Sequence, residues 1–274
     1  MPHATSKRRH IKPAPRLITW RALRISLLLM LLAIIAMSAW LTRRNATDWN
    51  RPLWVVAFPI NADGSAVTAA YLDTLTRESF APIEQYLAEQ ARGHGVTRAA
   101  PLEIRLGPHL AQSPPTPPHG GSVLRVVAWS LHLRWWAWRA ASAYDGPPID
   151  VRLFLLYHDP AQSQRLDHSV GLKEGMIAMT NVFADRSMAG SNLVVIAHEL
   201  LHTVGATDKY DPATGLPRYP DGYAEPERIP RYPQSYAELM GGRVPLSESA
   251  AEIPTDLGKT RIGTGTAGEI GWGK

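Results

Sequence analysis

The sequence contains no cysteine and, in its first 51 residues, only one acidic residue, Asp48. Without cysteine the chain can form neither a disulfide framework nor a thiolate metal site, although this absence does not assign a compartment. The same 51 residues hold ten Lys or Arg, which leaves nineteen basic and twenty-three acidic residues in the remainder. The formal net charge of +5 therefore belongs to an N-terminal tail. The body is slightly acidic, and we expect no nucleic-acid binding.

Charged residues are also missing from residues 25–41, where Ser26 and Ser38 are the only polar members. These seventeen residues, at a helical rise of about 1.5 Å each, are close to the lower limit for crossing a bilayer core of about 30 Å. Trp20 and Trp40 stand near its two ends, where interfacial aromatic residues belong. The pattern predicts one membrane-spanning signal-anchor helix.

Basic residues lie mainly on the N-terminal side of this segment, with seven Lys or Arg before it and three after it. By the positive-inside rule, residues 1–24 form a cytoplasmic tail, and the body that follows a linker at residues 42–52 is exported to the periplasm or the extracellular side. A cleaved signal peptide is the alternative, with Ala36, Ser38 and Ala39 as small processing-site residues. The long basic leader favours the uncleaved anchor.

The body, residues 53–274, is long and apolar enough to bury one hydrophobic core. Strands are predicted at residues 53–59, 102–106, 149–157 and 175–183, and helices at residues 67–77, 82–92, 123–144 and 264–272. The Pro- and Gly-rich residues 108–122 predict an exposed loop within one domain. Strand, helix and strand in succession at the start of the body indicate an α/β layer.

The predicted helix at residues 123–144 carries aromatic residues on two faces. One face consists of Leu124, Val127, Leu131, Trp135 and Trp138. A second face mixes basic and aromatic side chains, namely Arg125, Trp129, His132, Trp136 and Arg139. Such a mixture suits contact with a membrane surface. Aromatic residues at helical spacing more often pack in a core, and we favour packing.

The stretch that carries chemistry is residues 191–211, SNLVVIAHELLHTVGATDKYD. His198 and His202 lie four residues apart on one face of a predicted helix, so both imidazoles can reach a single metal ion. Glu199 is rotated by about 100° around the helix axis, where its carboxylate can address a water molecule rather than the metal itself. The pattern therefore predicts a hydrolytic metal site.

The ends of this helix strengthen the prediction. Ser191 is an N-cap residue type, and Gly205 can adopt the left-handed conformation that often ends a helix. After this end the chain returns toward the metal and presents Asp208, a hard oxygen ligand. We expect His198, His202 and Asp208 to bind one Zn²⁺ and to leave one position open, as a catalytic zinc site requires.

This order of residues resembles the HExxHxxGxxD pattern of the metzincin zinc peptidases, in the form found in snapalysin-like enzymes. Residues 238–242, ELMGG, resemble the Met-turn of that family, with Met240 beneath the metal. The resemblance implies an α+β catalytic domain with a twisted mixed sheet and an active-site helix. It also implies that the strand before this helix, residues 175–183, is a sheet edge that pairs with the substrate backbone, although an ordinary inner strand is an equal alternative.

Two other residues compete with Asp208 as the third ligand. Asp211 lies three residues further on and would serve if the turn were longer. Glu238 would serve in a thermolysin-type site, but Pro230 and Pro233 disfavour the second helix that such a site uses. Spacing favours Asp208 over both.

The group that would stabilise an oxyanion is not assigned. Some metzincins carry a Tyr two residues after the Met, and here that position is Gly242. Tyr236 and Arg243 are the remaining candidates.

We therefore interpret the chain as a membrane-anchored zinc endopeptidase that hydrolyses peptide bonds of protein or peptide substrates. A zinc-bound water would attack the carbonyl carbon, and Glu199 would act as general base and then pass the proton to the leaving amine. The alternative is a non-catalytic metal-binding envelope protein with a metzincin-like fold, against which the presence of Glu199 argues. An intramembrane protease is excluded because residues 193–204 are too short and too polar to lie in a bilayer.

Overall fold

The computed structural model describes residues 20–47, 49–97, 100–118, 120, 122–163, 165–166, 169–172 and 176–273. The chain divides into two compact units, Met1–Leu41 and Thr42–Lys274. The first 19 residues of the predicted cytoplasmic tail lie outside the described residues.

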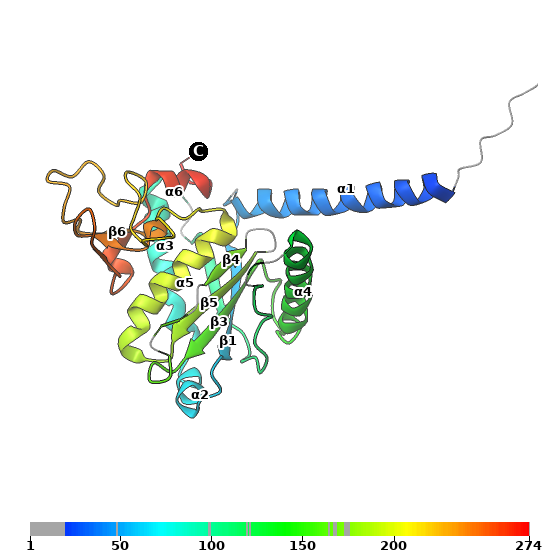
Figure 1. Cartoon of the computed structure of the whole chain (residues 1–274), viewed down its shortest axis with the longest axis horizontal. Helices are drawn as coiled ribbons and strands as arrows, with labels where there is room; N and C mark the ends of the chain where they lie inside the picture. Colours follow the sequence, from blue (N-terminus) through cyan, green and yellow to red (C-terminus); the bar gives the residue numbers. More distant parts are fainter. Residues whose placement is uncertain are drawn as a thin grey trace, which may run out of the picture. The chain divides into compact units, whose positions relative to one another are not determined.

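Helix α1 spans Trp20–Thr47, so it contains the predicted membrane span at residues 25–41 and continues into the predicted linker (Figure 1). Within the part of the chain that the structure describes, no helix is long and apolar enough to cross a membrane. The side chains of residues 35, 36 and 38–41 lie outside this part. The membrane anchor stays a prediction.

A five-stranded sheet forms the centre of the second unit, in the order β2-β1-β3-β5-β4 (Figure 1). Its strands are β1 (Leu53–Asn61), β2 (Leu102–Leu106), β3 (Val151–His158), β4 (Val170–Leu172) and β5 (Ile177–Phe183). Strands β1, β2, β3 and β5 are mutually parallel, and β4 runs antiparallel to β5. All four strands predicted from the sequence form.

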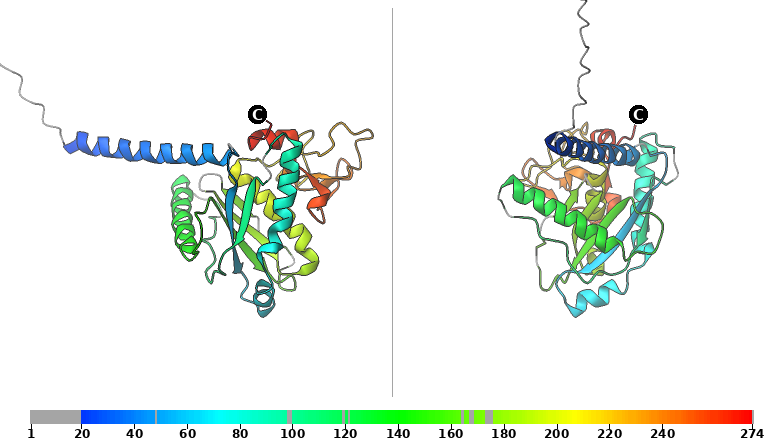
Figure 2. Two further views of the ribbon diagram at one scale, coloured as in Figure 1. Left: turned by 180° about the vertical axis from the view of Figure 1, so that it is seen from behind. Right: turned by 90° about the vertical axis from the view of Figure 1, so that its right-hand side faces the viewer.

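Helices cover both faces of this sheet (Figure 2). Helices α3 (Ala81–Gly93) and α5 (Ala189–Val204) pack on one face, where Val55 and Ala57 of β1 join their core cluster. Helix α4 (Val123–Ala141) packs on the other face, over a second cluster that includes Val56 and Phe58. Because both faces are buried, the inner strands β1, β3 and β5 are mostly apolar, whereas the edge strand β2 alternates. A mainly parallel sheet between two helix layers is an α/β architecture, which corrects the α+β class expected from the sequence.

The preference for packing over membrane contact is confirmed for Trp136 of the basic and aromatic face of α4. The buried residues of the helix are Leu133, Trp136, Ala137 and Ala141, while Leu131, on the other face, is 63% exposed. Trp136 packs on Phe154 of β3, with ring centroids 4.6 Å apart. Helical periodicity locates two apolar stripes on α4, but it does not say which one meets the sheet.

Of the two equal alternatives for residues 175–183, the ordinary inner strand is the one observed, and the edge strand that the resemblance implies is not. Strand β5 lies inside the sheet between β3 and β4, and β4 forms the edge. Val170, Gly171 and Leu172 of β4 pair with Met179, Ala178 and Ile177 of β5. A strand of three residues has no repeating pattern that the sequence could reveal.

The remaining elements flank this three-layer core. The helix predicted at residues 67–77 is divided into α2 (Ala66–Leu72) and a 3₁₀ turn, η1 (Arg77–Phe80). The C-terminal part contains α6 (Thr264–Glu269) and short pieces: β6 (Ala237–Glu238), η3 (Leu239–Gly241), β7 (Val244–Pro245), β8 (Ala251–Glu252), η4 (Leu257–Lys259) and β9 (Thr260–Arg261). Six α-helices lie among the described residues.

Candidate metal centre

Helix α5 carries both histidines of the predicted site. It begins at Ala189, two residues before Ser191, which we expected to be its cap. The Ser191 hydroxyl instead donates to the carbonyl of Met188, 3.0 Å away. The helix ends at Gly205, whose φ of 113° lies in the left-handed region that favours glycine. The chain therefore turns back toward the face of α5 that carries the imidazoles.

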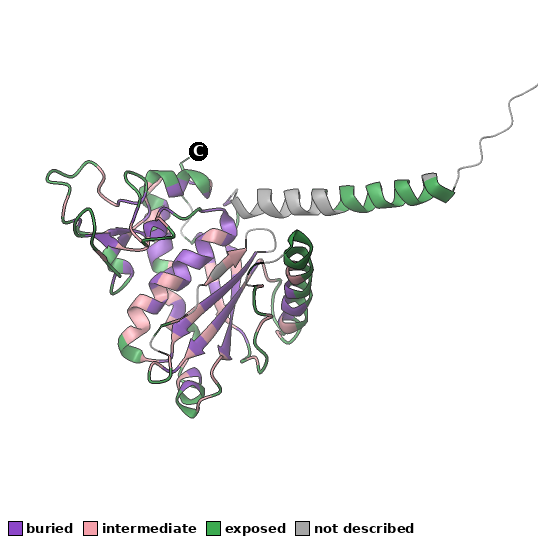
Figure 3. Cartoon of the chain, viewed as in Figure 1, coloured by how far each residue is buried: buried purple, intermediate pink, exposed green. Residues whose placement is uncertain are grey.

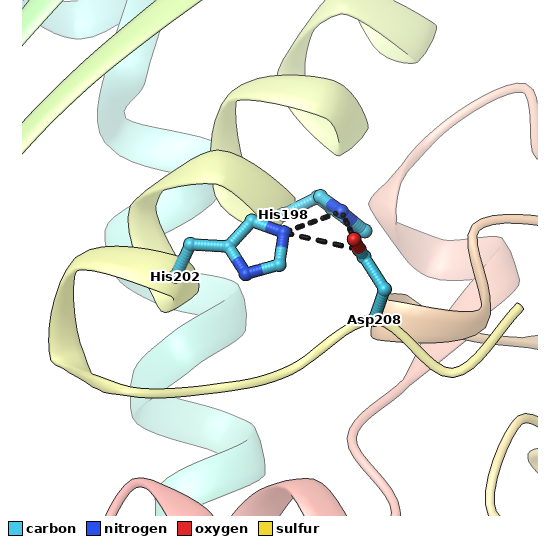
Figure 4. A group of neighbouring side chains, drawn as sticks. All are labelled: His198, His202 and Asp208. Carbon is cyan, nitrogen blue, oxygen red and sulfur yellow. Dashed lines mark hydrogen bonds and ion pairs between the residues drawn. The ribbon is translucent and has the colours of Figure 1, made fainter. Parts of the chain in front are cut away.

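The three predicted ligands meet at one point (Figure 4). The Nε2 atoms of His198 and His202 lie 3.1 Å apart. Each Nε2 also lies 3.1 Å from Oδ1 of Asp208. The three potential ligand atoms thus form a triangle with equal sides.

Backbone carbonyls fix the orientation of both rings. The Nδ1 atom of His198 lies 2.9 Å from the carbonyl oxygen of Leu239, and that of His202 lies 2.9 Å from the carbonyl oxygen of Ala206. A carbonyl oxygen only accepts hydrogen bonds, so each Nδ1 carries a hydrogen and donates it. Each neutral ring then presents the lone pair of its Nε2 to the same point, which is the arrangement that metal-binding histidines adopt.

These distances fit a zinc ion. Three atoms separated by 3.1 Å occupy three corners of a tetrahedron whose centre is about 1.9 Å from each, close to the about 2.0–2.1 Å of zinc–nitrogen bonds. Two imidazole nitrogens and one carboxylate oxygen are a donor set that suits zinc. The residues present therefore fit one zinc ion with a fourth corner left for another ligand.

The two competing ligands have other partners. Asp211 Oδ1 accepts the N–H of Ala213 at 2.7 Å within its own turn. The Glu238 carboxylate accepts hydrogen bonds from the N–H groups of Gly241 and Gly263 and from the hydroxyl of Thr266. Among the described residues, neither belongs to the group that could hold a metal.

Burial and hydrogen bonding act in opposite directions on the pKa values of Asp208 and His202. Burial raises the pKa of Asp208, but hydrogen bonds from His198 and His202 outweigh it and hold the pKa well below its usual range. Burial lowers the pKa of His202, but its bonds to Asp208 and Ala206 raise that pKa above the usual value. A cation between these atoms, whether a proton or a metal ion, is therefore favoured.

Glu199 lies beside the ligands without joining them. It is 7% exposed, and its Oε2 has no hydrogen-bond partner among the described residues. Burial raises the pKa of Glu199, and the neighbouring imidazoles oppose this only in part. An unpartnered carboxylate oxygen beside a metal site is available to hold a proton.

Edge strand β4 packs directly against this part of α5. A Cβ atom at Gly171 would collide with Cβ of His202 and would lie 2.7 Å from the carbonyl oxygen of Glu199. Only glycine fits at this position without moving the helix away from the strand.

Glu269 of α6 holds the loop of Asp208 through the two residues that flank Asp208 in the sequence. The Glu269 carboxylate accepts the N–H of Thr207 at 2.8 Å and its hydroxyl at 2.7 Å. The side chain of Lys209 is 8% exposed, and its ammonium lies 2.7 Å from the same carboxylate. Burial raises the pKa of Glu269, but the bonds from Lys209 and Thr207 outweigh it and hold the pKa below its usual value.

The predicted Met-turn lies directly below the site as the 3₁₀ turn η3. Met240 is fully buried. The carbonyl of Leu239 accepts from His198, and the carbonyl of Met240 accepts the N–H of Lys209 at 2.9 Å. The turn therefore connects one histidine ligand to the loop of Asp208.

Tyr210 is a neighbour of the site to which the sequence interpretation gave no catalytic role. Its ring centroid lies 6.3 Å from that of His198. Burial raises the pKa of Tyr210, and the negative charges of Asp208 and Glu199 raise it further. The sequence signal that could have identified Tyr210 as a neighbour of the site is its position two residues after Asp208.

The two earlier candidates for oxyanion stabilisation lie elsewhere. The ring of Tyr236 stacks under the Arg261 guanidinium at 3.7 Å, and Arg243 lies against Gly215. Among the described residues, neither forms a hydrogen bond or ion pair with the three ligands.

No known family model matches this chain, and no curated protein matches it significantly.

Proposed function

We propose that the chain is a zinc-dependent endopeptidase of the metzincin type. The observation that supports it most is the convergence of two Nε2 lone pairs and one carboxylate oxygen beside the buried, unpartnered Oε2 of Glu199. A structural zinc site would have four protein ligands, whereas the described residues supply three.

The chemistry divides between the ion and the chain. A zinc ion bound by His198, His202 and Asp208 supplies Lewis acidity for water activation and carbonyl polarisation. Glu199 accepts at Oε2 the proton of the water that attacks the peptide carbonyl, and then delivers this proton to the leaving amine. The raised pKa of Glu199 suits both steps. A carboxyl group whose pKa is closer to neutral pH accepts and releases a proton more readily at that pH.

Peptides are the proposed substrate class because of β4. Among the described residues this strand pairs only with β5, so no described strand covers its outer edge, and its Gly171 lies beside Glu199 and His202. An extended peptide can add to such an edge through main-chain hydrogen bonds.

We also propose that residues 25–41 anchor the protein in a membrane, with the N-terminus in the cytoplasm and the body exported. The uncharged apolar run and its basic N-terminal flank support this topology. Protease added to spheroplasts, in which the outer layers are opened and the cytoplasmic membrane is intact, should digest the body and leave the N-terminal tail protected; digestion only after lysis of the cytoplasmic membrane would contradict this topology.

The proposed activity is tested by comparing bound zinc and cleavage of an unfolded protein for the full chain and three variants. Wild type should hold one zinc ion and cleave the substrate. Glu199→Gln should keep the zinc and lose about 10²-fold or more in rate, the usual contribution of a general base. Asp208→Ala should lose both.

Asp211→Ala is the matched control, because Asp211 is an acidic residue of the same loop whose carboxylate, among the described residues, accepts hydrogen bonds only from the N–H groups of Ala213 and Thr214. It should retain zinc and activity. Full activity of Glu199→Gln, or full zinc content of Asp208→Ala, would contradict the proposal. Zinc binding by wild type without cleavage of any substrate would favour the non-catalytic metal-binding alternative.

A further inference from the structure

Helix α4 has a second apolar stripe on the side that does not meet the sheet. Its members, which we call the outer stripe, are Leu124, Val127, Leu131, Trp135 and Trp138. Leu124 is 79% exposed and Trp138 is 65% exposed. Figure 3 shows how exposed and buried positions alternate along α4. Exposed apolar residues in a continuous row mark an interaction surface more often than scattered ones do.

The geometry of α4 separates this stripe from the packed one. At about 100° per residue, the outer stripe fits within an arc of about 80° around the helix axis. Leu133, Trp136 and Ala137, which pack on the sheet, lie on the opposite side. The helix therefore has one apolar face for its own core and another that faces outward.

Basic residues border the outer stripe on both sides. Arg134 lies along one border, and Arg125 and Arg139 lie along the other; all three are exposed. The Arg139 guanidinium lies 5.9 Å from the ring centroid of Trp135. No acidic residue occurs between Val123 and Ala141. The surface combines leucine and tryptophan with a purely positive border.

We propose that the outer stripe of α4 binds the surface of an anionic lipid bilayer, with the helix lying in the plane of the interface. Leucine side chains would enter the boundary between headgroups and acyl chains, tryptophans would lie at the headgroup level, and the arginines would contact anionic headgroups. The proposal depends neither on the zinc site nor on the membrane anchor.

Charge selects this partner over a second copy of the chain. Two α4 helices packed through their outer stripes would bring arginine borders together without any acid from either helix to pair with them. An anionic membrane offers the complementary charge over the whole length of the helix.

The absence of cysteine allows a local test in the full chain. A polarity-sensitive fluorophore is attached to the single cysteine of Leu131→Cys. The matched control is Ser249→Cys, which carries the same fluorophore at an exposed position outside α4. Both proteins are reconstituted into phosphatidylcholine vesicles with and without phosphatidylglycerol. Quenching is measured with acrylamide in the water and with brominated acyl chains in the bilayer.

With phosphatidylglycerol present, the label at residue 131 should shift to the blue, become severalfold less accessible to acrylamide and be quenched by the brominated lipid. The label at residue 249 should not change. In Leu131→Cys combined with Arg134→Glu and Arg139→Glu, quenching by the lipid should be lost while the far-ultraviolet spectrum and zinc content stay as in wild type.

Three results would overturn the proposal. A label at residue 131 that stays open to acrylamide in both vesicle types has no bilayer contact. Equal protection in both vesicle types shows that lipid charge plays no part. If protection of the label at residue 131 from acrylamide increases with the number of protein molecules per vesicle and not with lipid charge, a second copy of the chain covers the outer stripe.

Discussion

The Nε2 atoms of His198 and His202 lie 3.1 Å apart although each ring uses its Nδ1 hydrogen for a backbone carbonyl. Two facing lone pairs repel each other unless a cation lies between them. Without metal that cation is a proton, which the raised pKa of His202 favours. Zinc and protons therefore compete for the same position.

This competition predicts how zinc affects stability at different pH. Because the folded-state pKa of His202 is raised, its stabilising contribution to the metal-free protein is present below the unfolded pKa and is lost as the pH rises through the folded pKa. The increase in Tm on adding zinc should therefore be larger at about pH 8 than at about pH 5.5. Thermal unfolding of chelator-treated and zinc-loaded protein measures it.

His202→Gln should abolish the zinc-dependent increase in Tm. The matched control is His94→Gln, because the Nε2 of His94 bonds to the carbonyl of Ile262 and not to the site. The control should keep the whole zinc-dependent increase. An increase that is the same at both pH values, or that survives in His202→Gln, would show that zinc binds elsewhere.

A second prediction concerns Glu269, which holds the loop of Asp208 through Thr207 and Lys209. In Glu269→Gln the side-chain NH₂ would replace one carboxylate oxygen and would face a donor of Thr207 or Lys209. The nearly buried ammonium of Lys209 would also lose its counter-charge. We expect a loss of about 2 kcal/mol in the free energy of unfolding and about tenfold weaker zinc binding. Denaturant unfolding and a zinc titration measure the two effects.

The same contact has a predictable pH dependence. Because the pKa of Glu269 is lowered by folding, its contribution is present above the unfolded pKa and is lost as the pH falls through the folded pKa. Glu103→Gln is the control, since Glu103 lies on β2, at the opposite edge of the sheet from β4, and pairs with Arg77 of η1 and with Arg105. That partly exposed pair should contribute below about 1 kcal/mol and leave zinc binding unchanged. Equal effects of the two variants would refute a positioning role for Glu269.

The sequence predicted the local features of this site. His198 and His202 share a helix face because of their spacing, and Gly205 ends the helix because glycine adopts a positive φ at low cost. Strands β1 and β3 were predictable for a related reason, since burial on both faces makes them nearly continuously apolar. Each of these inferences depends on residues within one segment.

The features that the sequence did not predict depend on contacts between distant segments. Lys209 and Glu269 are sixty residues apart, and no local pattern relates them. Strand β4 is defined by its pairing with β5 rather than by composition. The orientation of α4 depended on which of two apolar stripes met Phe154. Such choices are made by packing and are absent from helical or strand periodicity.

A third prediction follows from the close approach of β4 to α5. The Cβ of Gly171→Ala would push against His202 and Glu199 and would force strand and helix apart. We expect a loss of about 1–3 kcal/mol in stability from overpacking, together with weaker zinc binding. Gly93→Ala is the control, because a Cβ there meets no atom within 4 Å. It should be neutral or slightly stabilising in α3. If Gly171→Ala unfolds and binds zinc like wild type, β4 does not constrain the site.

The last prediction assigns a role to Tyr210 and rests on the proposed peptidase activity. Its pKa is raised, so the phenol stays protonated and can donate a hydrogen bond to charge that develops on a substrate oxygen. Tyr210→Phe should lower kcat by about 10², the usual effect of removing one such donor, with KM and zinc content nearly unchanged. Steady-state kinetics with a fluorogenic peptide measure it.

Tyr219→Phe controls for the loss of a phenol from the same region, since Tyr219 is exposed and stacks under Arg231 rather than near His198. It should retain the wild-type kcat. An unchanged kcat in Tyr210→Phe would remove Tyr210 as the donor. A loss of zinc in that variant would instead show that Tyr210 supports His198 or Asp208, because a donor that acts only on the substrate oxygen leaves metal affinity unaffected.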